Sequence, residues 1–450
     1  MSFEEIFKAY DIRGIFPEQL NEGFAERLGK ALVVFFNAKK ICVARDMRLS
    51  SPQLHKALLK GIVSQGCSAV DFGLCATDEF YFCTAKQNLP AGVMVTASHN
   101  PKQYNGFKIV GKKCSPIGIE TGLPEIKKLV EKNIFPKAKK RGKVLKKNLL
   151  NEFAKTCLSF VKKKHFRKLK VVVDFGNGMA SLTAKKAFAG LPMKIIPLCY
   201  GLDGSFPNHE ANPLVEQNRK HVEETVIEKK ADLAIAFDGD ADRCFFIDER
   251  GKFVPGDFIA ALLAKNMLKK KKGTVLLDVR CSRFAAKTVE EAGGKFLLNR
   301  VGHTFFKKSM REKKAVFGGE LSGHYYYNFE KYGYISDNAI VSALLVLELL
   351  SLENKKFSEL LSEAENNFFP SGEINSEVHD KEAKIQELEA HYKGSAEKIF
   401  WLDGISVEFS EWWFNVRPSN TESLLRLNLE ANSKSLMEEK LAEVLKIIRT

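Results

Sequence analysis

Apolar and polar residues follow one order along the chain, and this order recurs three times. A short apolar strand ends at or beside an aspartate, and a serine, a helix, a glycine and a second apolar strand follow. We find this order in residues 41–72, 171–198 and 275–298. Strands that alternate with helices are typical of a mainly parallel sheet. Any α/β sequence shows some of this pattern, but the matching aspartate and serine positions favour three related α/β domains.

The individual elements are predicted from the same pattern. Serine hydroxyls are favoured at helix N-caps, and glycine is favoured just beyond a helix end. The predicted N-caps are Ser50 or Ser51, Ser181 and Ser282. The predicted helices cover residues 53–64, 182–189 and 283–292. The predicted strands cover residues 41–44, 69–72, 93–95, 171–173, 193–198, 233–237, 244–247, 275–277 and 296–298.

The end of the chain does not carry the repeat. A helix is expected at residues 381–391, strands at 405–409 and 413–416, and a closing helix from 436. The predicted fold class is therefore α/β with four domains: three related α/β domains with mainly parallel sheets and a smaller α+β C-terminal domain. A lysine-rich stretch at 137–147 and a change of composition near 368–372 mark two boundaries. The predicted domains are 1–147, 148–252, 253–368 and 369–450.

Composition narrows the function classes. The 450 residues contain 70 Lys and Arg against 55 Asp and Glu, which gives a formal charge of +15. The basic patches are not interleaved with aromatic residues, so we expect no nucleic-acid partner. No uncharged run is long enough to span a bilayer, and the acidic start is unlike a secretion signal. The nine cysteines are scattered and odd in number. These features predict a cytoplasmic protein with reduced thiols and no membrane partner.

One loop between two predicted buried strands carries three carboxylates, those of Asp238, Asp240 and Asp242. Carboxylates this close repel one another unless a cation neutralises them, and Mg²⁺ and Ca²⁺ prefer oxygen ligands. An EF-hand also begins Asp-x-Asp-x-Asp, but Arg243 stands where that loop requires glycine, and the flanks here are strands. We expect an open metal site that shares its ion with a phosphate, with Arg243 beside it. A solvated acidic turn is the alternative.

A second loop, Thr-Ala-Ser-His-Asn-Pro at 96–101, follows a predicted strand. Ser98 stands on this loop beside His99, with Lys108 ten residues further along the chain. A serine in these surroundings is a candidate nucleophile. The Gly-x-Ser-x-Gly elbow of many hydrolases is absent, and an asparagine before a proline is also ordinary turn chemistry. The loop alone leaves both interpretations open.

A third loop, Gly-Gly-Glu-Leu-Ser-Gly-His at 318–324, carries Glu320, Ser322 and His324. An acceptor, a hydroxyl and an imidazole between glycines are suited to binding the hydroxyl groups of a sugar. His303 stands on another glycine turn upstream. A single histidine is more often structural, but two histidines in glycine turns favour a site.

A fourth loop, near the end of the chain, begins at Arg417 and contains Ser419, Asn420 and Thr421. A guanidinium with hydroxyl, amide and backbone N–H donors can hold a phosphate dianion. Arg426 on the following strand is a further donor. A proline in the loop removes one backbone donor.

Taken together, these loops resemble the α-D-phosphohexomutase family over the whole chain, and more closely its phosphomannomutase/phosphoglucomutase branch. Arg280 replaces the lysine that is frequent in this branch, and Ser423 replaces a usual proline. Phosphoglucosamine mutase is therefore kept as an alternative. The motifs that carry the resemblance are Tyr-Asp-Ile-Arg-Gly at 10–14, Thr-Ala-Ser-His-Asn-Pro at 96–101, Asp-Gly-Asp-Ala-Asp-Arg at 238–243, Gly-Glu-Leu-Ser-Gly-His at 319–324 and Arg-Pro-Ser-Asn-Thr-Glu at 417–422.

The resemblance implies a four-domain enzyme with a central cleft that moves phosphate between O6 and O1 of mannose or glucose. It implies that Ser98 carries a phosphoryl group and that Ser98 and the three aspartates hold one Mg²⁺. A bisphosphorylated hexose would be both intermediate and activator. Further roles are expected for Arg13, Lys108, Arg243 and His303 in catalysis, and for Tyr10, His99, Arg280, Glu320, Ser322, His324, Arg417, Ser419, Asn420, Thr421 and Arg426 in substrate binding.

Two rival functions use the same residues. A phosphatase would let water take the phosphoryl group from Ser98, but it would not need a dedicated clamp for a second phosphate. A non-catalytic sugar-phosphate sensor would not need Ser98 and three metal carboxylates. We therefore expect a mutase that acts on a phosphosugar as a monomer or weak dimer. Lys108 and His303 are the candidate general bases for the sugar hydroxyl.

Overall fold

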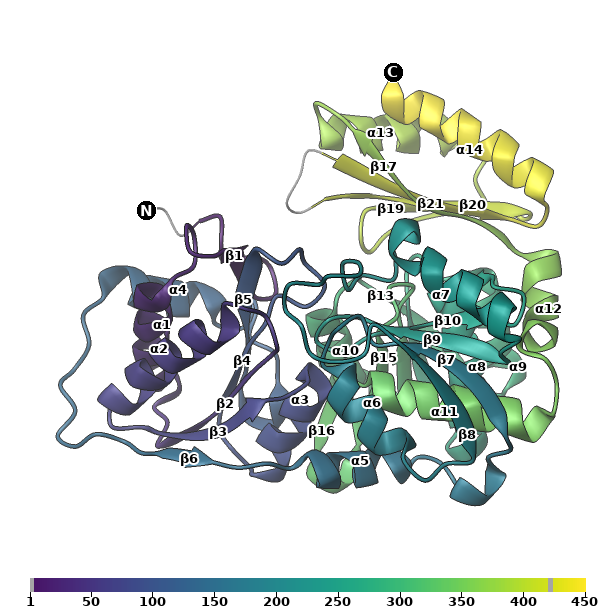
Figure 1. Ribbon diagram of the computed structural model, residues 1–450. Helices are drawn as coiled ribbons and strands as arrows, with labels where there is room; N and C mark the ends of the chain where they lie inside the picture. Colours follow the sequence, from purple (N-terminus) through teal and green to yellow (C-terminus); the bar gives the residue numbers. More distant parts are fainter. Residues whose placement is uncertain (1–3, 420–423) are drawn as a thin grey trace. The chain divides into compact units, whose positions relative to one another are not determined.

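The computed structural model describes residues 4–419 and 424–450, which form two compact units (Figure 1). The first, here called the serine unit, consists of Met1–Val254 and His324–Phe357. The second, here called the arginine unit, consists of Pro255–Gly323 and Ser358–Thr450. Each unit is described by itself.

The serine unit begins with a six-stranded sheet in the order β1-β5-β4-β2-β3-β6. The strands β2, β3, β4 and β6 run parallel, whereas β5 pairs antiparallel with both β4 and β1. The helices α1 and α2 pack together, and Phe24, Leu28 and Leu58 contribute to the core beneath them. The elements are β1 (Ile12–Ile15), α1 (Glu22–Phe36), β2 (Lys40–Arg45), α2 (Ser51–Ser64), β3 (Ser68–Leu74), α3 (Thr77–Lys86), β4 (Gly92–Val95), β5 (Tyr104–Val110), α4 (Leu123–Lys132) and β6 (Val144–Lys146), with a short 3₁₀ turn at Lys112–Cys114.

A second sheet of the serine unit has the order β11-β10-β9-β7-β8. Its strands β8, β7 and β9 are parallel, and β9 and β10 form an antiparallel hairpin. The antiparallel pair β15 and β16 and the buried helix α11 belong to the same unit. The elements are α5 (Leu150–Leu158), β7 (Leu169–Asp174), α6 (Ala180–Phe188), β8 (Met193–Leu198), α7 (Glu216–Lys229), β9 (Leu233–Phe237), β10 (Cys244–Asp248), β11 (Phe253–Val254), β15 (Tyr325–Phe329), β16 (Tyr334–Asp337) and α11 (Ala339–Glu353), with 3₁₀ turns at Lys163–His165 and Glu330–Tyr332.

The arginine unit contains the parallel strands β13, β12 and β14 and an antiparallel sheet in the order β17-β21-β20-β19-β18. The helices α13 and α14 lie on one face of that antiparallel sheet (Figure 1). The elements are α8 (Gly256–Lys270), β12 (Thr274–Asp278), α9 (Arg283–Glu291), β13 (Lys295–Asn299), α10 (His303–Lys313), β14 (Phe317–Gly319), α12 (Phe357–Asn367), β17 (Phe369–Glu377), α13 (Lys381–Tyr392), β18 (Lys398–Trp401), β19 (Ile405–Glu408), β20 (Trp412–Pro418), β21 (Leu424–Ala431) and α14 (Lys434–Arg449).

The predicted helices and strands are present, with ends that differ by a few residues. Two predicted serine caps have the right position: the Ser282 hydroxyl accepts a hydrogen bond from Phe284 N, and Ser50 is the N-cap residue of α2. Ser50 makes no side-chain cap, and Ser51 donates instead to Asp46 Oδ1 at 2.5 Å. Ser181 lies inside α6, not before it. Pattern alone does not reveal that neighbouring aspartates and loops compete for a serine hydroxyl.

The C-terminal sheet has more strands than the pattern predicted. We did not predict β17 and β18, and we expected β21 only as the strand that carries Arg426. The strand β17 contains Pro370 and Gly372, which normally argue against a strand, and its pairing with β21 shifts register between Pro370 and Glu373. Among the described residues, no helix is both long and apolar enough to cross a membrane. All nine cysteines are free thiols, and eight of them are buried.

Candidate functional site

The serine loop of residues 96–101 connects β4 to β5 and holds Ser98 in an unusual backbone conformation. Ser98 has a φ of 51°, in the left-handed region that a serine rarely adopts. Its N–H donates to Thr96 Oγ1 at 2.9 Å. The Ser98 side chain is buried, with Oγ 3.1 Å from Asp238 Oδ2 and 3.1 Å from His99 Nδ1. Strain of this kind concentrates at functional sites, where the surrounding structure fixes the residue.

The turn of the β9–β10 hairpin carries the three predicted aspartates. Asp238, Asp240 and Asp242 are at most 2% exposed, and their ligand atoms lie within 4.8 Å of one another. Gly239 fits because a Cβ there would come within 2.7 Å of the Ser98 carbonyl oxygen. The hairpin therefore brings the carboxylate cluster directly against the serine loop. The flanking strands confirm that this turn is not an EF-hand.

Two cations neutralise part of this charge. Lys108 Nζ donates to Asp240 Oδ2 at 2.8 Å and to Asp242 Oδ2 at 2.6 Å. Arg243 Nε donates to Asp238 Oδ2 at 2.9 Å. The Lys108 ammonium therefore offsets negative charge on two of the three carboxylates.

The pKa values reflect this balance of burial and charge. Burial, reinforced by the neighbouring Asp242, raises the pKa of Asp238 to about 7. Burial alone would also raise the pKa of Asp240, but the Lys108 ammonium holds it below its usual range. Burial and the nearby cations Arg243, Arg13 and Lys108 lower the pKa of His99 well below its usual value. The His99 ring beside Ser98 is therefore neutral.

The carboxylate cluster fits a hard divalent cation. Asp240 Oδ1 and Asp242 Oδ1 are buried and accept no hydrogen bond from any described residue. An unsatisfied buried carboxylate oxygen is costly, and a cation would relieve this cost. The donor set is entirely oxygen, which Mg²⁺ prefers. Arg243 Nη2 also has no hydrogen-bond partner among the described residues, so one donor is left for an anion.

Further predicted residues surround the serine loop within the serine unit. Arg13 Nη1 donates to Asn100 Oδ1 and Nη2 to Asp11 Oδ2, both at 2.5 Å. His324 Nδ1 lies 2.9 Å from Asp337 Oδ2 and 4.0 Å from Asp242 Oδ1. Tyr10 is half-buried just before β1. The structure thus places Arg13 and His324 near the cluster.

We did not predict the role of Arg48. Its side chain is fully buried, and Nη2 donates to the carbonyl oxygens of Ser98 at 2.7 Å and Asn100 at 2.6 Å. Its Nη1 donates to two further carbonyl oxygens, those of Pro101 and Tyr104. Arg48 therefore fixes the shape of the serine loop. The available signal was an Asp-x-Arg sequence directly after a predicted buried strand.

In the arginine unit, three guanidinium groups surround one carboxylate. Glu373 Oε2 lies 2.5 Å from Arg417 Nη2 and 3.4 Å from Arg280 Nη1, and Oε1 lies 3.1 Å from Arg426 Nη1. Arg280 also forms a two-pronged pair with Asp278 through Nε at 3.0 Å and Nη2 at 2.8 Å. The prediction did not include Glu373 because it lies on β17, which contains a proline and a glycine.

The charges in this arginine cluster influence one another. Burial alone would raise the pKa of Glu373, but Arg417, Arg280 and Arg426 lower it below its usual value. Burial and the neighbouring Arg280 lower the pKa of Arg417. Three guanidinium groups that converge on one carboxylate are suited to a dianionic phosphate, and the charge of Arg280 is also offset by Asp278.

The other predicted residues of the arginine unit lie on turns. Glu320 is buried, and its Oε2 accepts from Gly302 N at 2.9 Å. Gly302 has a φ of 123°, which favours glycine, and His303 begins α10 directly after it. Ser322 is half-buried on the turn before β15.

The predicted phosphate loop is described only in part. Arg417 and Ser419 are both buried, and the Ser419 carbonyl oxygen accepts from Lys381 Nζ at 3.0 Å. Asn420 and Thr421 lie outside the described residues. The structure therefore brings Arg280, Arg417 and Arg426 together and leaves the rest of this loop as a prediction.

Comparison with known families gives matches along nearly the whole chain. Models of phosphoglucomutase/phosphomannomutase match as alpha/beta/alpha domain I at residues 4–137, domain II at 148–251, domain III at 255–368 and the C-terminal domain at 373–447.

Individual proteins agree with these matches. The chain is 39% identical to a phosphomannomutase of Escherichia coli, and the alignment covers 98% of this chain and 99% of the relative. It is 39% identical to phosphohexose mutases of Xanthomonas campestris over 98% of this chain and 99% of theirs. A solved structure of a phosphoglucomutase/phosphomannomutase family protein from Burkholderia thailandensis superposes with a TM-score of 0.89 at 29% identity, covering 100% of this chain and 98% of that one.

Proposed function

Because the chain belongs to the phosphoglucomutase/phosphomannomutase family, we propose that it interconverts hexose 6-phosphate and hexose 1-phosphate, with mannose, glucose or both as the sugar. The observation that carries the proposal is the position of Ser98. Its Oγ lies 3.1 Å from Asp238 in a buried cluster of three carboxylates and two cations. A nucleophile beside a metal-binding set is the arrangement that phosphoryl transfer requires.

The reaction we propose has two transfers through Ser98. In the first, a free hydroxyl of the sugar phosphate attacks the phosphorus of phospho-Ser98. The bond from phosphorus to Ser98 Oγ breaks, and a bisphosphosugar forms. In the second, Ser98 Oγ attacks the other phosphate of this intermediate, and the isomeric monophosphate leaves. The second transfer restores phospho-Ser98, so the net reaction consumes no water.

The residues of the serine unit would supply positioning and charge. Mg²⁺ held by Asp238, Asp240, Asp242 and an oxygen on Ser98 would neutralise charge on the transferred phosphoryl group. Lys108 keeps two of the carboxylates in place, since its ammonium group bonds to both. Arg243 retains one donor, Nη2, that can reach a phosphoryl oxygen.

The arginine unit would hold the phosphate that is not reacting. Arg280, Arg417 and Arg426 converge on Glu373, so their guanidinium groups are already oriented before a substrate arrives. Ser419, Asn420 and Thr421 are proposed to complete this phosphate site. Tyr10, His99, Glu320, Ser322 and His324 are proposed to bind the sugar, with Arg13 and His303 as further catalytic residues. Lys108 is proposed for charge and not as the general base.

We propose domain boundaries at residues 147, 252 and 368, a cytoplasmic location, and a monomer or weak dimer without nucleic-acid or membrane partners. A bisphosphorylated hexose is proposed as intermediate and activator.

Coupled assays would test the function. Mannose 1-phosphate, glucose 1-phosphate and glucosamine 1-phosphate are supplied separately with a catalytic amount of glucose 1,6-bisphosphate and Mg²⁺. We expect formation of the 6-phosphate from mannose or glucose. Turnover of glucosamine 1-phosphate alone would assign the chain to the phosphoglucosamine reaction, and no turnover of any sugar would refute the mutase proposal.

A further inference from the structure

Outside the proposed active site, Asp174, Cys199 and His209 place three different ligand atoms close together. Asp174 ends β7, Cys199 follows β8, and His209 lies on the loop before α7, so all three belong to the serine unit. His209 Nε2 is 2.9 Å from Asp174 Oδ2 and 3.4 Å from Cys199 Sγ. All three ligand atoms lie within 4.8 Å of one another.

Each side chain is held so that one ligand atom points to the same place. His209 Nδ1 is 2.8 Å from the Glu210 carbonyl oxygen, which fixes the proton on Nδ1 and directs Nε2 towards the cluster. Metal-binding histidines commonly have this backbone partner on their other nitrogen. Asp174 Oδ1 accepts from Gly176 N at 2.9 Å, so Oδ2 is the oxygen that remains for the cluster.

Hydrogen bonding is the alternative to a metal ion here, with Asp174 accepting from His209 and from the Cys199 thiol. A single hydrogen on His209 Nε2 can point to Asp174 or to Cys199, but not well to both. The bond to Asp174 and the contact with Cys199 outweigh burial and raise the pKa of His209 to about 11, so a bound proton is the competing occupant. Cys199 has a φ of 46°, an uncommon backbone conformation for a non-glycine residue.

We propose that Asp174, Cys199 and His209 form a binding site for a borderline-soft divalent cation, with Zn²⁺ the best match. Thiolate, imidazole and carboxylate are the usual ligands of Zn²⁺, whereas Mg²⁺ avoids sulfur and nitrogen. Cys199 and His209 are only partly buried, so a water molecule can take the fourth position. Binding displaces the Nε2 proton of His209 and the thiol proton of Cys199, and both leave to solvent.

A cation bound by Asp174, Cys199 and His209 would link the loop of residues 199–209 to the end of β7. The segment after β7 packs on the aspartate turn, because Met179 N donates to the Gly239 carbonyl oxygen at 2.9 Å. A cation would therefore stabilise a region next to the carboxylate cluster without touching it. The proposal does not depend on the mutase reaction.

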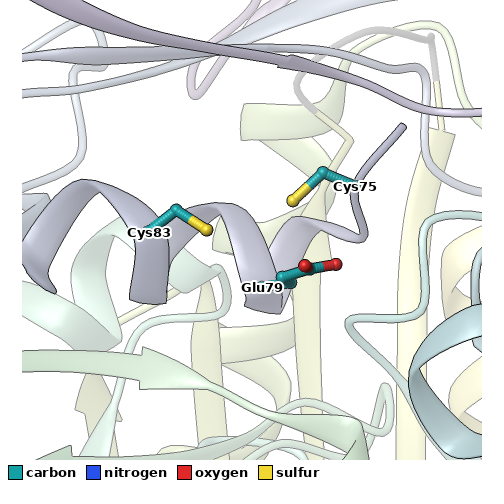
Figure 2. A group of neighbouring side chains, drawn as sticks. All are labelled: Cys75, Glu79 and Cys83. Carbon is teal, nitrogen blue, oxygen red and sulfur yellow. The ribbon is translucent and has the colours of Figure 1, made fainter. Parts of the chain in front are cut away.

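A second group, Cys75, Glu79 and Cys83, looks similar but has another explanation (Figure 2). All three residues are buried, at most 4% exposed. Glu79 lies in the first turn of α3 and accepts hydrogen bonds from the Ala76 backbone and from Cys75. This is a helix-capping arrangement, so the Glu79 carboxylate already has donors. Cys83 therefore provides a matched control cysteine.

The test uses Co²⁺ as a spectroscopic substitute for Zn²⁺ on the full-length, chelator-treated, reduced protein with Mg²⁺ in excess. A thiolate-to-cobalt charge-transfer band reports only a cysteine ligand, so Co²⁺ at an all-oxygen site stays silent in this band. We expect the band to saturate at one equivalent, and Zn²⁺ to abolish it with an apparent Kd tighter than about 1 µM.

The variants decide which residues bind. Cys199→Ser should lose the band and weaken Zn²⁺ binding at least about 100-fold, beyond the usual effect of an outer-shell change. Cys83→Ser should keep both properties. His209→Gln gives a second, independent variant, and circular dichroism checks the fold of each. A wild-type protein without the band, or a band that survives Cys199→Ser or disappears in Cys83→Ser, overturns the proposal.

Discussion

The two units of this protein each contain a charge cluster, buried in the serine unit and partly buried in the arginine unit, and the two clusters are opposite in composition. In the serine unit three aspartates are held by Lys108 and Arg243. In the arginine unit three arginines are held by Glu373. In each cluster, fewer groups of the opposite charge lie between the like-charged groups. These opposite charges orient the like-charged side chains before any ligand binds, which reduces the free-energy cost of ordering those side chains on binding.

The clusters also differ in what they leave unsatisfied. In the aspartate cluster of the serine unit, Asp240 Oδ1 and Asp242 Oδ1 have no hydrogen-bond partner among the described residues, and these oxygens suit a cation. In the arginine cluster, Arg417 Nε is a buried donor without a hydrogen-bond partner among the described residues, which suits an anion. One cluster is therefore suited to chemistry at phosphorus with a metal ion, and the other to holding a phosphate without one.

The largest effect is expected from Ser98→Ala. Removal of the only proposed phosphoryl acceptor should lower kcat at least about 1000-fold, comparable with the loss of a major charge-stabilising group in other phosphoryl transfers. Intact-mass measurement should show one phosphate on the wild type and none on the variant. Ser64→Ala is the control, because Ser64 lies at a helix end and its hydroxyl donates to the Gly61 carbonyl oxygen. Wild-type turnover in Ser98→Ala would contradict the serine relay.

Asp240→Asn should have the next largest effect. Loss of one charged ligand should weaken Mg²⁺ binding and lower kcat on the order of 100-fold. The measurement is the Mg²⁺ dependence of turnover. Asp257→Asn is a matched control, because Asp257 is a buried carboxylate of the arginine unit whose Oδ2 accepts from Ser282 N at 2.7 Å. An unchanged Mg²⁺ requirement in Asp240→Asn would make the aspartate turn purely structural.

Arg417→Ala should act on binding more than on chemistry. Loss of a charge-assisted contact costs roughly 1.5–3 kcal/mol, or about 10- to 100-fold in KM. Because one clamp serves both half-reactions, KM should rise for the 1-phosphate and for the 6-phosphate alike. Arg219→Ala removes an arginine that pairs with Glu223 on α7 and should change neither constant. A defect in one direction only would refute a shared clamp.

The smallest effect is expected on stability, from Glu373→Gln. Without the carboxylate, three guanidinium groups repel one another, and the C-terminal domain should lose about 1–3 kcal/mol of unfolding free energy. All three tryptophans, Trp401, Trp412 and Trp413, lie in this domain, so their fluorescence during urea unfolding reports on it. Inorganic phosphate should stabilise the variant more than the wild type. Equal stability and equal phosphate response would mean that Glu373 does not hold the arginines.

Acid titration sharpens the same test. The pKa of Glu373 in the folded protein lies below its ordinary value of 4.5. A carboxyl group whose pKa is lowered by folding stabilises the folded protein at pH values above its ordinary pKa. This stabilisation is lost as the pH falls below that ordinary pKa. The wild type should therefore lose its advantage over Glu373→Gln as the pH falls from about 4.5. If the wild type stays more stable than Glu373→Gln at lower pH, the difference in unfolding free energy comes from a group other than the Glu373 carboxylate.

Sequence predicted the serine-unit cluster better than the arginine cluster, and the reason is locality. The three aspartates and Arg243 lie within six residues of one turn, so their proximity is visible in the chain. Arg280, Glu373, Arg417 and Arg426 come from separate segments, and Glu373 lies on a strand that contains a proline and a glycine. Arg48 was missed because its partners are backbone carbonyl oxygens of a distant loop. Ser50 stands at the N-cap of α2, but its hydroxyl accepts from Asn105, and Ser181 lies inside α6 with its hydroxyl accepting from Gly201 N.

The most direct test measures the sugar phosphates and inorganic phosphate in the same sample. Wild-type protein with Mg²⁺ and a trace of glucose 1,6-bisphosphate is given mannose 1-phosphate, and then glucose 1-phosphate, while ³¹P NMR records the mixture. The account predicts that at least one 1-phosphate is converted into its 6-phosphate until equilibrium, with no inorganic phosphate formed. Accumulation of inorganic phosphate as the 1-phosphate disappears would show that water takes the phosphoryl group, and it would contradict the mutase mechanism.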